Sequence, residues 1–468
     1  MPISADTTQA LLRLLGAQRV LTEPSERLAY GYDNSREQAL PDWVVFPETH
    51  DEVTRIVQLC AQEKIPLTTR GRGTGTTGAA VPTHGGIVLS TERMDRILEI
   101  SPDDRLMVVQ PGVTNQAVQA AAAEHGFFWP PDPTSAAVCT IGGNLAYNSA
   151  GPRAVKYGTP RENTLGLRAV SGSGETLHTG TRTTKGVVGY DLTRLLIGSE
   201  GTLAVITEAT LRLTPLPETT HTLQAIYADI GSATQAIARI MAQPVVPCAL
   251  EFIDGAAINM VRAVSAANLP ENAGALLMIE VDGPRSAMPE MVDAVSQAAT
   301  TDGLLSLETA STTEEIQALW ATRKALSPAL RNVAPKKINE DVVVPVSKIP
   351  DLLHGLERLA QQHDITIVNF GHAGNGNIHV NLLIDPDDPR QAAGAEACLD
   401  AVFSLVLGLD GSLSGEHGIG LVKREFVARE IGAPTLQLMQ GIRQTFDPHN
   451  ILNPGKAFPV NLRPAKPT

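Results

Sequence analysis

A glycine-rich run at residues 70–78, RGRGTGTTG, constrains the fold of this chain more than any other segment. The residues before it, 65–69 (IPLTT), predict a strand, and residues 73–78 match the letters GxGxxG of a Rossmann dinucleotide site. A Rossmann site requires a helix directly after the glycines, and Pro82 and Gly85 prevent one. We therefore predict a compact loop whose backbone N–H groups bind a pyrophosphate, with a tight solvent turn as the alternative.

Two further segments are rich in small residues. Residues 130–151 read PPDPTSAAVCTIGGNLAYNSAG, and residues 197–202 read IGSEGT. The dense Gly, Pro, Asn and Ser content predicts a long irregular binding loop over residues 130–160. Its amides and the side chains of Asn144 and Asn148 can hydrogen-bond a flat ring with polar edges.

In order and spacing, these segments resemble the FAD-binding domain of the vanillyl-alcohol-oxidase/PCMH flavoprotein superfamily. The run from Glu48 to Pro82 resembles its pyrophosphate loop, IGGNLAYNSAG its isoalloxazine loop, and LLIGSEGTLAVIT its closing motif. The resemblance implies bound FAD, to which a C-terminal tail containing FDPHNILNPGK returns. The implied FAD-binding residues are Arg70, Gly71, Arg72, Gly73, Thr74, Gly75, Thr77, Gly78, Pro131, Thr134, Gly142, Gly143, Asn144, Asn148, Gly151, Glu200, Gly201, Ile206 and Asn453.

Two departures from that family pattern bear on the flavin. Members that attach flavin covalently often carry His in the pyrophosphate loop or Cys in the flavin loop. The pyrophosphate loop here has neither, and Cys139 stands where a small loop residue suffices, so we predict non-covalent FAD. Ala150-Gly151 replaces the family's frequent Gly-Gly, which shifts the expected flavin edge slightly.

Two histidines and an acidic residue in the C-terminal half form a candidate metal site. Side chains alternate along the strand NIHVNLLI, residues 377–384, so His379 and Asn381 share one face. His372 ends the preceding strand, and the short turn AGNGN can fold it back beside His379. Glu416 can add a carboxylate, which would leave open positions for a substrate. The alternative is that these histidines are core residues bonded to backbone.

The motifs around these residues extend the resemblance. GHAGNGNIH and SGEHGIG are similar to motifs of the FAD-linked oxidase C-terminal domain, found in D-lactate dehydrogenases, glycolate oxidase D-subunits and D-2-hydroxyglutarate dehydrogenases. The resemblance implies that His372, His379 and Glu416 bind a divalent metal, with zinc expected, and that His417 is the catalytic base. Asn375 replaces the usual Asp of the turn, where a structural role is expected.

Four further residues are candidates for substrate binding. Arg323 matches the family's WxxR, which implies a bidentate clamp on a substrate carboxylate and a catalytic role. Ser327 lies one turn later on the same expected helix face. Lys337 and Asn381 complete the set, and solvated surface charge is the alternative for each basic residue.

These features predict an α+β chain with three parts. Residues 1–217 are expected to form a two-part PCMH-type FAD-binding domain, and residues 218–432 an α+β substrate and metal domain built on an antiparallel sheet. Residues 433–468 are expected to form a C-terminal segment that packs back on the FAD domain. Residues 194–197 are predicted as one of the strands of the first part.

The resulting functional hypothesis is an FAD-dependent dehydrogenase of a small D-2-hydroxy acid, D-lactate or glycolate. The substrate would chelate the metal, His417 would remove the hydroxyl proton, and a hydride would pass to flavin N5. D-2-Hydroxyglutarate is the alternative substrate. A sugar or lactone oxidase, a non-catalytic flavin electron-transfer subunit and a structural protein are competing functions. A quinone, a cytochrome or an electron-transfer flavoprotein are all open as electron acceptor.

Composition narrows the partners and the location. Lys and Arg number 37 against 50 Asp and Glu, a net charge of −13, which argues against a nucleic-acid partner. The four cysteines, Cys60, Cys139, Cys248 and Cys398, form no CxxC pair, so buried thiols are expected. Without a signal pattern or a continuous apolar span, we expect a cytoplasmic protein, with peripheral attachment to the inner membrane face and a homodimer left open.

Overall fold

The computed structural model describes residues 4–262, 269–320, 326 and 334–459. Contacts between residues divide the chain into two units. The first unit comprises Met1–Gly151, Gly158–Leu216 and Glu416–Thr468, and the second comprises Pro152–Tyr157 and Pro217–Gly415. The predicted roles of three parts, as an FAD-binding domain, a substrate domain and a C-terminal segment, stay predictions.

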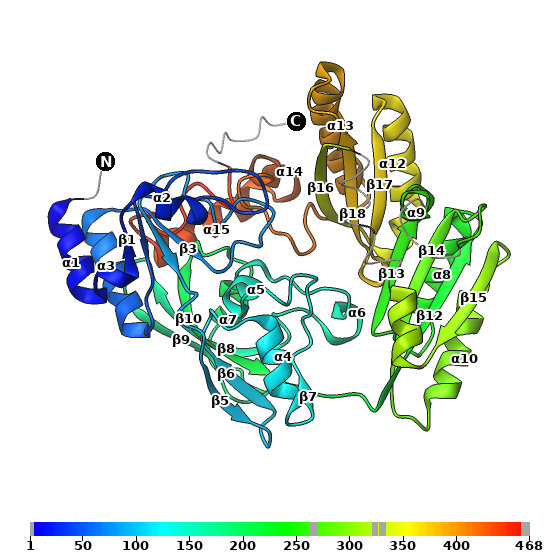
Figure 1. Ribbon diagram of the computed structural model, residues 1–468, viewed down its shortest axis with the longest axis horizontal. Helices are drawn as coiled ribbons and strands as arrows, with labels where there is room; N and C mark the ends of the chain where they lie inside the picture. The colour runs from blue at the N-terminus through cyan, green and yellow to red at the C-terminus, as the bar shows by residue number, and fades with distance from the viewer. Residues whose placement is uncertain (1–3, 263–268, 321–325, 327–333, 460–468) are drawn as a thin grey trace. The chain divides into compact units, whose positions relative to one another are not determined.

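The first unit mixes short helices with three small sheets (Figure 1). Its helices are α1 (Ala5–Leu15), η1 (Ala17–Arg19), α2 (Pro24–Arg27), η2 (Leu28–Tyr30), α3 (His50–Glu63), α4 (Asn115–Ala123), α5 (Ile141–Tyr147), α7 (Leu192–Leu196), η5 (Arg424–Phe426), α14 (Val427–Glu430) and α15 (Ala433–Phe446). Its strands are β1 (Val20–Leu21), β2 (Trp43–Val45), β3 (Leu67–Arg70), β4 (Ile87–Ser90), β5 (Ile97–Ser101), β6 (Leu106–Val109), β7 (Phe127–Phe128), β8 (Thr164–Ser171), β9 (Thr176–Gly180), β10 (Ala204–Arg212) and β11 (Thr214–Pro215).

A four-stranded sheet, in the order β1-β2-β4-β3, presents the glycine run. The central strand β4 pairs in parallel with β2 and β3, and every residue of β4 is buried. A strand buried on both faces needs a continuous apolar run, which Ile87–Leu89 supplies. Because β3 ends at Arg70, the glycine loop emerges from the carboxyl end of a parallel strand, the usual place for ligand loops.

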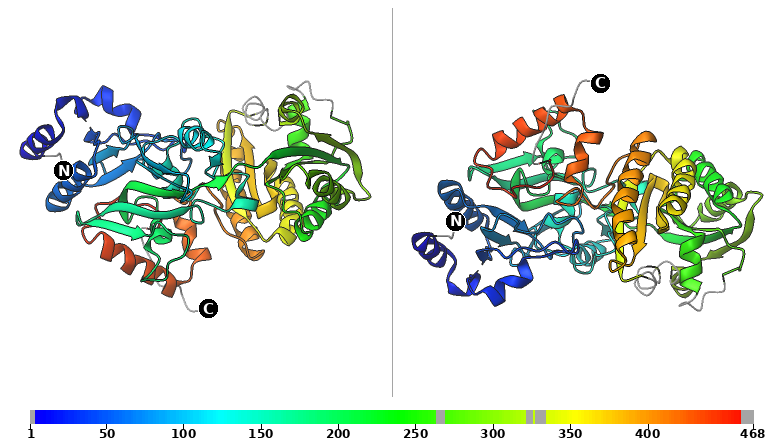
Figure 2. Two further views of the ribbon diagram at one scale, coloured as in Figure 1. Left: turned by 90° about the horizontal axis from the view of Figure 1, so that it is seen from below. Right: turned by 90° about the horizontal axis from the view of Figure 1, so that it is seen from above.

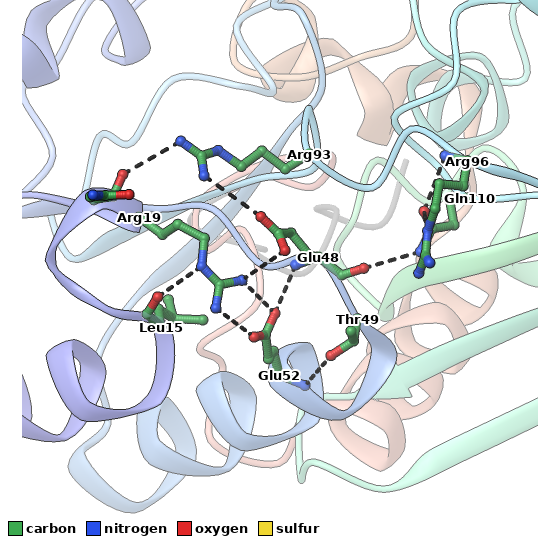
Figure 3. A network of polar contacts seen from close by, with 9 residues as sticks. Leu15, Arg19, Glu48, Thr49, Glu52, Arg93, Arg96 and Gln110 are labelled. Carbon is green, nitrogen blue, oxygen red and sulfur yellow. Dashed lines mark hydrogen bonds and ion pairs between the residues drawn. The ribbon is translucent and has the colours of Figure 1, made fainter.

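Helix α3 is fixed at its start by a polar network (Figure 3). The N-cap Thr49 hydroxyl accepts the N–H of Glu52 at 3.2 Å, and the Glu52 carboxylate accepts the N–H of Glu48, the residue before the N-cap, at 2.8 Å. Arg19, just before β1, donates to the same Glu52 carboxylate at 2.8 Å. Helix α3 is therefore held next to β1, one edge strand of the sheet, and the glycine loop follows β3, the other edge strand.

A second sheet of the first unit, in the order β5-β6-β10-β8-β9, is antiparallel in all its pairs. Its apolar face packs with α4 and α5 around Trp129, which is fully buried. The C-terminal helix α15, red in Figure 2, lies beside this sheet, and Gly172 donates its N–H to the Phe446 carbonyl at 2.8 Å. The end of the chain is therefore part of the first unit.

The second unit is one sheet with helices on both faces. Its helices are α6 (Ala154–Tyr157), α8 (Ile230–Ala242), α9 (Gly255–Arg262), α10 (Met288–Ala299), η3 (Val346–Lys348), α12 (Ile349–His363), η4 (Ala373–Asn375) and α13 (Pro389–Gly408). Its strands are β12 (Thr219–Tyr227), β13 (Ala249–Asp254), β14 (Ala275–Gly283), β15 (Leu304–Ala310), β16 (Lys336–Val343), β17 (Thr366–His372) and β18 (Asn377–Ile384).

The seven strands follow the order β15-β12-β14-β13-β17-β18-β16, and each described pair is antiparallel. Helix α9 packs on one face through Ile258 and Val261, against Ile253 and Phe370. Helices α8 and α10 pack against β12 and β14, α12 against β17, and α13 against β18 (Figure 1). The predicted α+β class with an antiparallel sheet in the second part is confirmed.

Two local predictions were wrong. Residues 194–197 are not a strand, because Asp191 accepts the N–H of Arg194 at 3.0 Å and starts helix α7 there. The segment 130–160 is not irregular throughout, since it contains α5 and α6. In both places the segment's composition did not predict a helix, but a side chain caps the start of one. The cap is Asp191 for α7 and Thr140 for α5.

Helix α13 is the one described helix with the length and mean hydropathy, 1.2, that a membrane crossing requires. Its residues Cys398, Val402, Phe403 and Val406 are buried within the second unit. Of the 18-residue window that satisfies the length and composition test, 28% is buried inside the protein.

Candidate active site

Glycines shape the loop that follows β3. Gly73 has a φ of +66°, a left-handed conformation that glycine adopts without strain. A Cβ at Gly71 would lie 2.4 Å from Thr140 Oγ1, and one at Gly75 would lie 2.6 Å from Tyr147 Oη. The loop therefore packs directly on both ends of α5, which brings the predicted pyrophosphate and isoalloxazine loops together.

Helix α5 orders the predicted flavin loop. The Thr140 hydroxyl accepts the N–H of Gly143 at 3.3 Å, and the helix ends at Asn148, which has a φ of +55°. The buried Asn144 side chain accepts a hydrogen bond from Asn115 Nδ2 at 3.2 Å. These hydrogen bonds stabilise the conformation of the loop. The structure therefore shows a structural role for Asn144 and Asn148 in the loop itself.

Glu200 anchors the loop that carries His417. Its buried carboxylate accepts the N–H groups of Ile419 and Gly420 at 2.6 and 2.7 Å. Burial raises the pKa of Glu200, and these two hydrogen bonds oppose the rise because they favour the carboxylate. Thr77, in the glycine loop, donates its hydroxyl to the His417 carbonyl at 3.2 Å. The predicted base therefore lies on backbone held by both the glycine loop and Glu200.

The C-terminal tail reaches the same region. Asn453 donates from Nδ2 to the carbonyls of Glu200 and Ala79 at 2.7 and 2.9 Å. Its Oδ1 accepts a hydrogen bond from Lys456 Nζ at 2.6 Å. Lys456 is 1% exposed, and burial lowers its pKa to about 7. The amino group of Lys456 thus lies buried beside the end of the glycine loop.

The polar groups of this region fit a bound FAD. The Thr69 hydroxyl, at the end of β3, is buried and makes no hydrogen bond to any described residue. A Cβ added to Gly201 would lie 3.9 Å from Thr69 Cβ and 3.8 Å from Asn453 Nδ2, so the predicted contacts Gly201 and Asn453 are neighbours of each other and of Thr69. Main-chain N–H groups of a glycine loop and a buried ammonium such as Lys456 complement a pyrophosphate.

Two predicted arginines are held by the protein itself. Arg70 donates to the Tyr32 carbonyl at 2.7 Å, and Arg72 donates to the Glu92 carboxylate at 3.2 Å. Contacts of these side chains to FAD stay predictions, as do those of the other predicted FAD-binding residues. All of those lie in the first unit: Gly71, Gly73, Thr74, Gly75, Thr77, Gly78, Pro131, Thr134, Gly142, Gly143, Asn144, Asn148, Gly151, Glu200, Gly201, Ile206 and Asn453.

In the second unit, β17 and β18 form the expected hairpin. Phe370 pairs with His379 and His372 with Asn377, so the two histidines are diagonal neighbours on one face of the sheet. Their ring centroids are 5.2 Å apart and their planes are nearly perpendicular, at 85°. Both imidazoles are buried, at 7% exposed. The structure therefore places the two predicted metal ligands side by side.

A buried carboxylate lies behind the first of these histidines. Glu251 on β13 pairs across the sheet with His372, and its Oε1 is in hydrogen-bond contact with His372 Nδ1. With Glu251 ionised, the His372 ring would donate from Nδ1, and Nε2 would be the nitrogen suited to bind a cation. Glu251 was not among the residues predicted from the sequence, although an acidic residue in the apolar strand ALEFID was a signal.

A second buried carboxylate, Asp341 on β16, fixes the chain next to Glu416. It pairs across the sheet with His379 and accepts the Ser414 hydroxyl at 3.0 Å and the Gly415 N–H at 2.9 Å. Glu416 follows Gly415 through one peptide bond. One ligand atom from each of His372, His379 and Glu416 lies within 4.8 Å of the other two. Asp341 was not among the predicted residues either.

The predicted substrate-binding residues have different placements. Asn381 is fully buried, donates to the carbonyls of Val368 and His379, and accepts from Asn339 at 2.7 Å. This arrangement favours a structural role in the sheet, and a substrate contact stays a prediction. Lys337 lies on the edge strand β16 and pairs with Leu383 on β18. Arg323 and Ser327 lie outside the described residues.

Comparison with protein families decides the assignment. Residues 41–180 match the FAD binding domain family, and residues 216–457, more than half of the chain, match the family of FAD linked oxidases, C-terminal domain. The chain belongs to the FAD-linked oxidase family. The resemblance inferred from the sequence motifs is confirmed, and this FAD-linked oxidase is an oxidoreductase with a FAD-binding domain in its N-terminal half.

Named relatives match over nearly the whole FAD-linked oxidase chain. Glycolate oxidase subunit GlcD of Bacillus subtilis is 37% identical, with 98% of each chain covered. D-2-Hydroxyglutarate dehydrogenase of Xanthomonas citri pv. viticola is 35% identical, with 97% of each covered. A probable mitochondrial D-lactate dehydrogenase of Danio rerio is 32% identical, with 95% of this chain and 90% of the relative covered.

A solved structure confirms the expected fold. p-Cresol methylhydroxylase, determined with substrate bound, superposes with a TM-score of 0.76. The match covers 97% of the FAD-linked oxidase chain and 96% of the other chain, at 17% identity. At this identity the likeness concerns the fold, and the fold is the predicted PCMH type.

Proposed function

We propose that this FAD-linked oxidase is a dehydrogenase that oxidises a small D-2-hydroxy acid, glycolate or D-lactate, to the 2-oxo acid. The observation that carries the proposal is the pair His372 and His379, buried side by side on one sheet face, as metal-ligating imidazoles must be. The names of the three relatives support the substrate class, since each acts on a 2-hydroxy acid by its name.

The donor set fits a divalent metal. Two imidazoles and one carboxylate are a common set for zinc, and the ligand atoms of His372, His379 and Glu416 are mutually within 4.8 Å. A metal held there would act as a Lewis acid on the substrate hydroxyl and lower its pKa. Three protein ligands leave coordination positions for a chelating 2-hydroxy acid.

The remaining roles fall to residues of this chain. His417, next to Glu416 in sequence, is proposed to take the hydroxyl proton, because a neutral imidazole can act as a general base. Arg323, with Ser327 and Lys337, is proposed to bind the substrate carboxylate and orient the C2–H bond. FAD, when bound, supplies the two-electron acceptor for the oxidation.

Substrate choice separates two versions of the proposal. A second carboxylate bound by Lys337 and Arg323 would favour D-2-hydroxyglutarate over glycolate or D-lactate. The proposed electron acceptor is a quinone, a cytochrome or an electron-transfer flavoprotein. We propose that the protein is cytoplasmic, with peripheral attachment at the inner membrane face as the alternative.

A substrate panel tests the proposal. The purified yellow protein is mixed with glycolate, D-lactate, L-lactate and D-2-hydroxyglutarate, and a dye acceptor reports reduction. We expect turnover with a D-2-hydroxy acid or glycolate, its loss after chelation, and its return when Zn²⁺ is added. Absence of turnover with every acid in the panel would instead favour a non-catalytic flavin subunit. Turnover that survives complete metal removal would contradict the metal role.

A further inference from the structure

The side chain of Glu251 contacts the imidazole of His372, one of the proposed metal ligands. Glu251 and His372 face each other across β13 and β17, with the Glu251 Oε1 in contact with His372 Nδ1. Their side chains are 2% and 8% exposed. A carboxylate this deep in a sheet is stabilised only by strong hydrogen bonds, and the imidazole N–H provides one.

We propose that Glu251 is a positioning residue for metal binding, which holds the His372 imidazole as its Nδ1–H tautomer and aims Nε2 at the metal. This inference rests on the metal site proposed above. Metal-binding histidines commonly donate their second ring N–H to a carboxylate, which fixes the tautomer and orients the ring. Loss of such a partner typically weakens metal affinity by about 10–100-fold.

The geometry distinguishes Glu251 from a buried carboxylate whose partners are backbone N–H groups and an asparagine amide outside the proposed metal site. Asp254, three residues later on the same strand, is also buried, and it accepts the N–H groups of Ala257 and Asn369, both at 2.7 Å. Asp254 thus ties α9 and β17 to β13, whereas the contact of Glu251 is to a side chain of the proposed metal site. Asp254→Asn is therefore a matched control for the loss of a buried carboxylate from β13.

The test measures zinc affinity rather than turnover. Flavin-loaded wild-type protein and the variants Glu251→Gln and Asp254→Asn are stripped with a chelator, and Zn²⁺ is titrated against a competing fluorescent chelator. We expect Glu251→Gln to raise the Kd for Zn²⁺ by about 10–100-fold. The Asp254→Asn variant is expected to stay within about threefold of wild type, with FAD content unchanged in both.

The outcomes separate this inference from the proposed function. Wild-type Zn²⁺ affinity in Glu251→Gln would overturn the role of Glu251 and leave the metal site standing. No Zn²⁺ binding by the wild-type protein, with Mn²⁺ and Co²⁺ also failing, would overturn both.

A measurement on the wild-type protein covers the case in which Glu251→Gln does not fold. Histidine rings are labelled with ¹⁵N, and the His372 signals are assigned by their loss in His372→Asn. The proposal requires the Nδ1–H tautomer of His372 in the zinc-loaded protein. The Nε2–H tautomer would overturn it.

Discussion

The carboxylate of Asp341 accepts the backbone N–H of Gly415 at 2.9 Å, and so fixes the residue that directly precedes Glu416. Replacement by Ala removes this bond and the one from the Ser414 hydroxyl, each worth about 1.5–3 kcal/mol when the acceptor is charged. We expect Asp341→Ala to lower the free energy of unfolding and to weaken Zn²⁺ binding by about tenfold or more. Denaturant unfolding and metal titration check both effects.

The exposed Asp351, paired with Lys348 at 3.4 Å, is the control for that variant. Asp351→Ala should change stability by less than about 1 kcal/mol, because exposed ion pairs contribute little. Unchanged metal affinity in Asp341→Ala would show that Glu416 does not depend on the anchoring of Gly415.

His417→Ala tests the proposed base. FAD should stay bound, and turnover should fall by about 10²–10⁴-fold, the usual contribution of a general base. Steady-state kinetics with the best acid of the panel, together with the flavin absorbance, measures both. The exposed His449 is the matched control, and His449→Ala should leave turnover unchanged. A near-normal rate in His417→Ala would remove that imidazole from the mechanism.

Gly71→Ala tests the packing of the glycine loop on α5. The new methyl group would lie 2.4 Å from Thr140 Oγ1, so the loop or the helix cap must move, and we expect a loss of about 1–3 kcal/mol. Thr140→Ala alone removes an N-cap and should cost about 1 kcal/mol. The double variant should be more stable than the sum of the two predicts, because the clash is gone. Strict additivity in urea unfolding would contradict the contact.

The stability of the flavin-free protein should rise from pH 7 towards pH 10. Burial lowers the pKa of Lys456 in the folded protein to about 7, whereas an unfolded lysine titrates near 10.4. Between these values the unfolded chain binds more protons, so the free energy of unfolding increases with pH. Lys456→Met removes the buried charge and should stabilise the protein at pH 7, by an amount on the order of 3 kcal/mol.

The difference between Lys456→Met and wild type should shrink as pH approaches 10. Thermal unfolding of both proteins at pH 7, 8.5 and 10 measures it, and the exposed Lys185→Met is the control. A constant difference across this range would mean that Lys456 stays charged in the folded state.

Local patterns in the sequence identified the parts of the site that are close together in the chain. His372 and His379 are joined by one short turn, so the alternation of side chains was enough to place them on one face. The glycine loop was recognised because Pro82 and Gly85 exclude a Rossmann helix. Family motifs then supplied Glu416 and His417.

Contacts between distant residues could not be obtained in this way. Glu251 and His372 are 121 residues apart, and only the strand order β14-β13-β17 brings them together. Helix α5 was missed because Gly142 and Gly143 lower helix propensity, whereas the structure relies on the Thr140 cap. The apolar run Leu195–Ile197 suggested a strand. In the structure it lies at the end of helix α7, whose start is stabilised by the Asp191 side-chain cap.

The division of the chain into units has a consequence for any attempt to dissect this enzyme. The backbone passes between the units at 151/152, 157/158, 216/217 and 415/416. A fragment ending near residue 216 would lack Ile419 and Gly420, the partners of the Glu200 carboxylate, and would expose a buried anion without its donors. The first unit therefore cannot be cut out as one contiguous piece, and a fragment that ends near residue 216 should be insoluble.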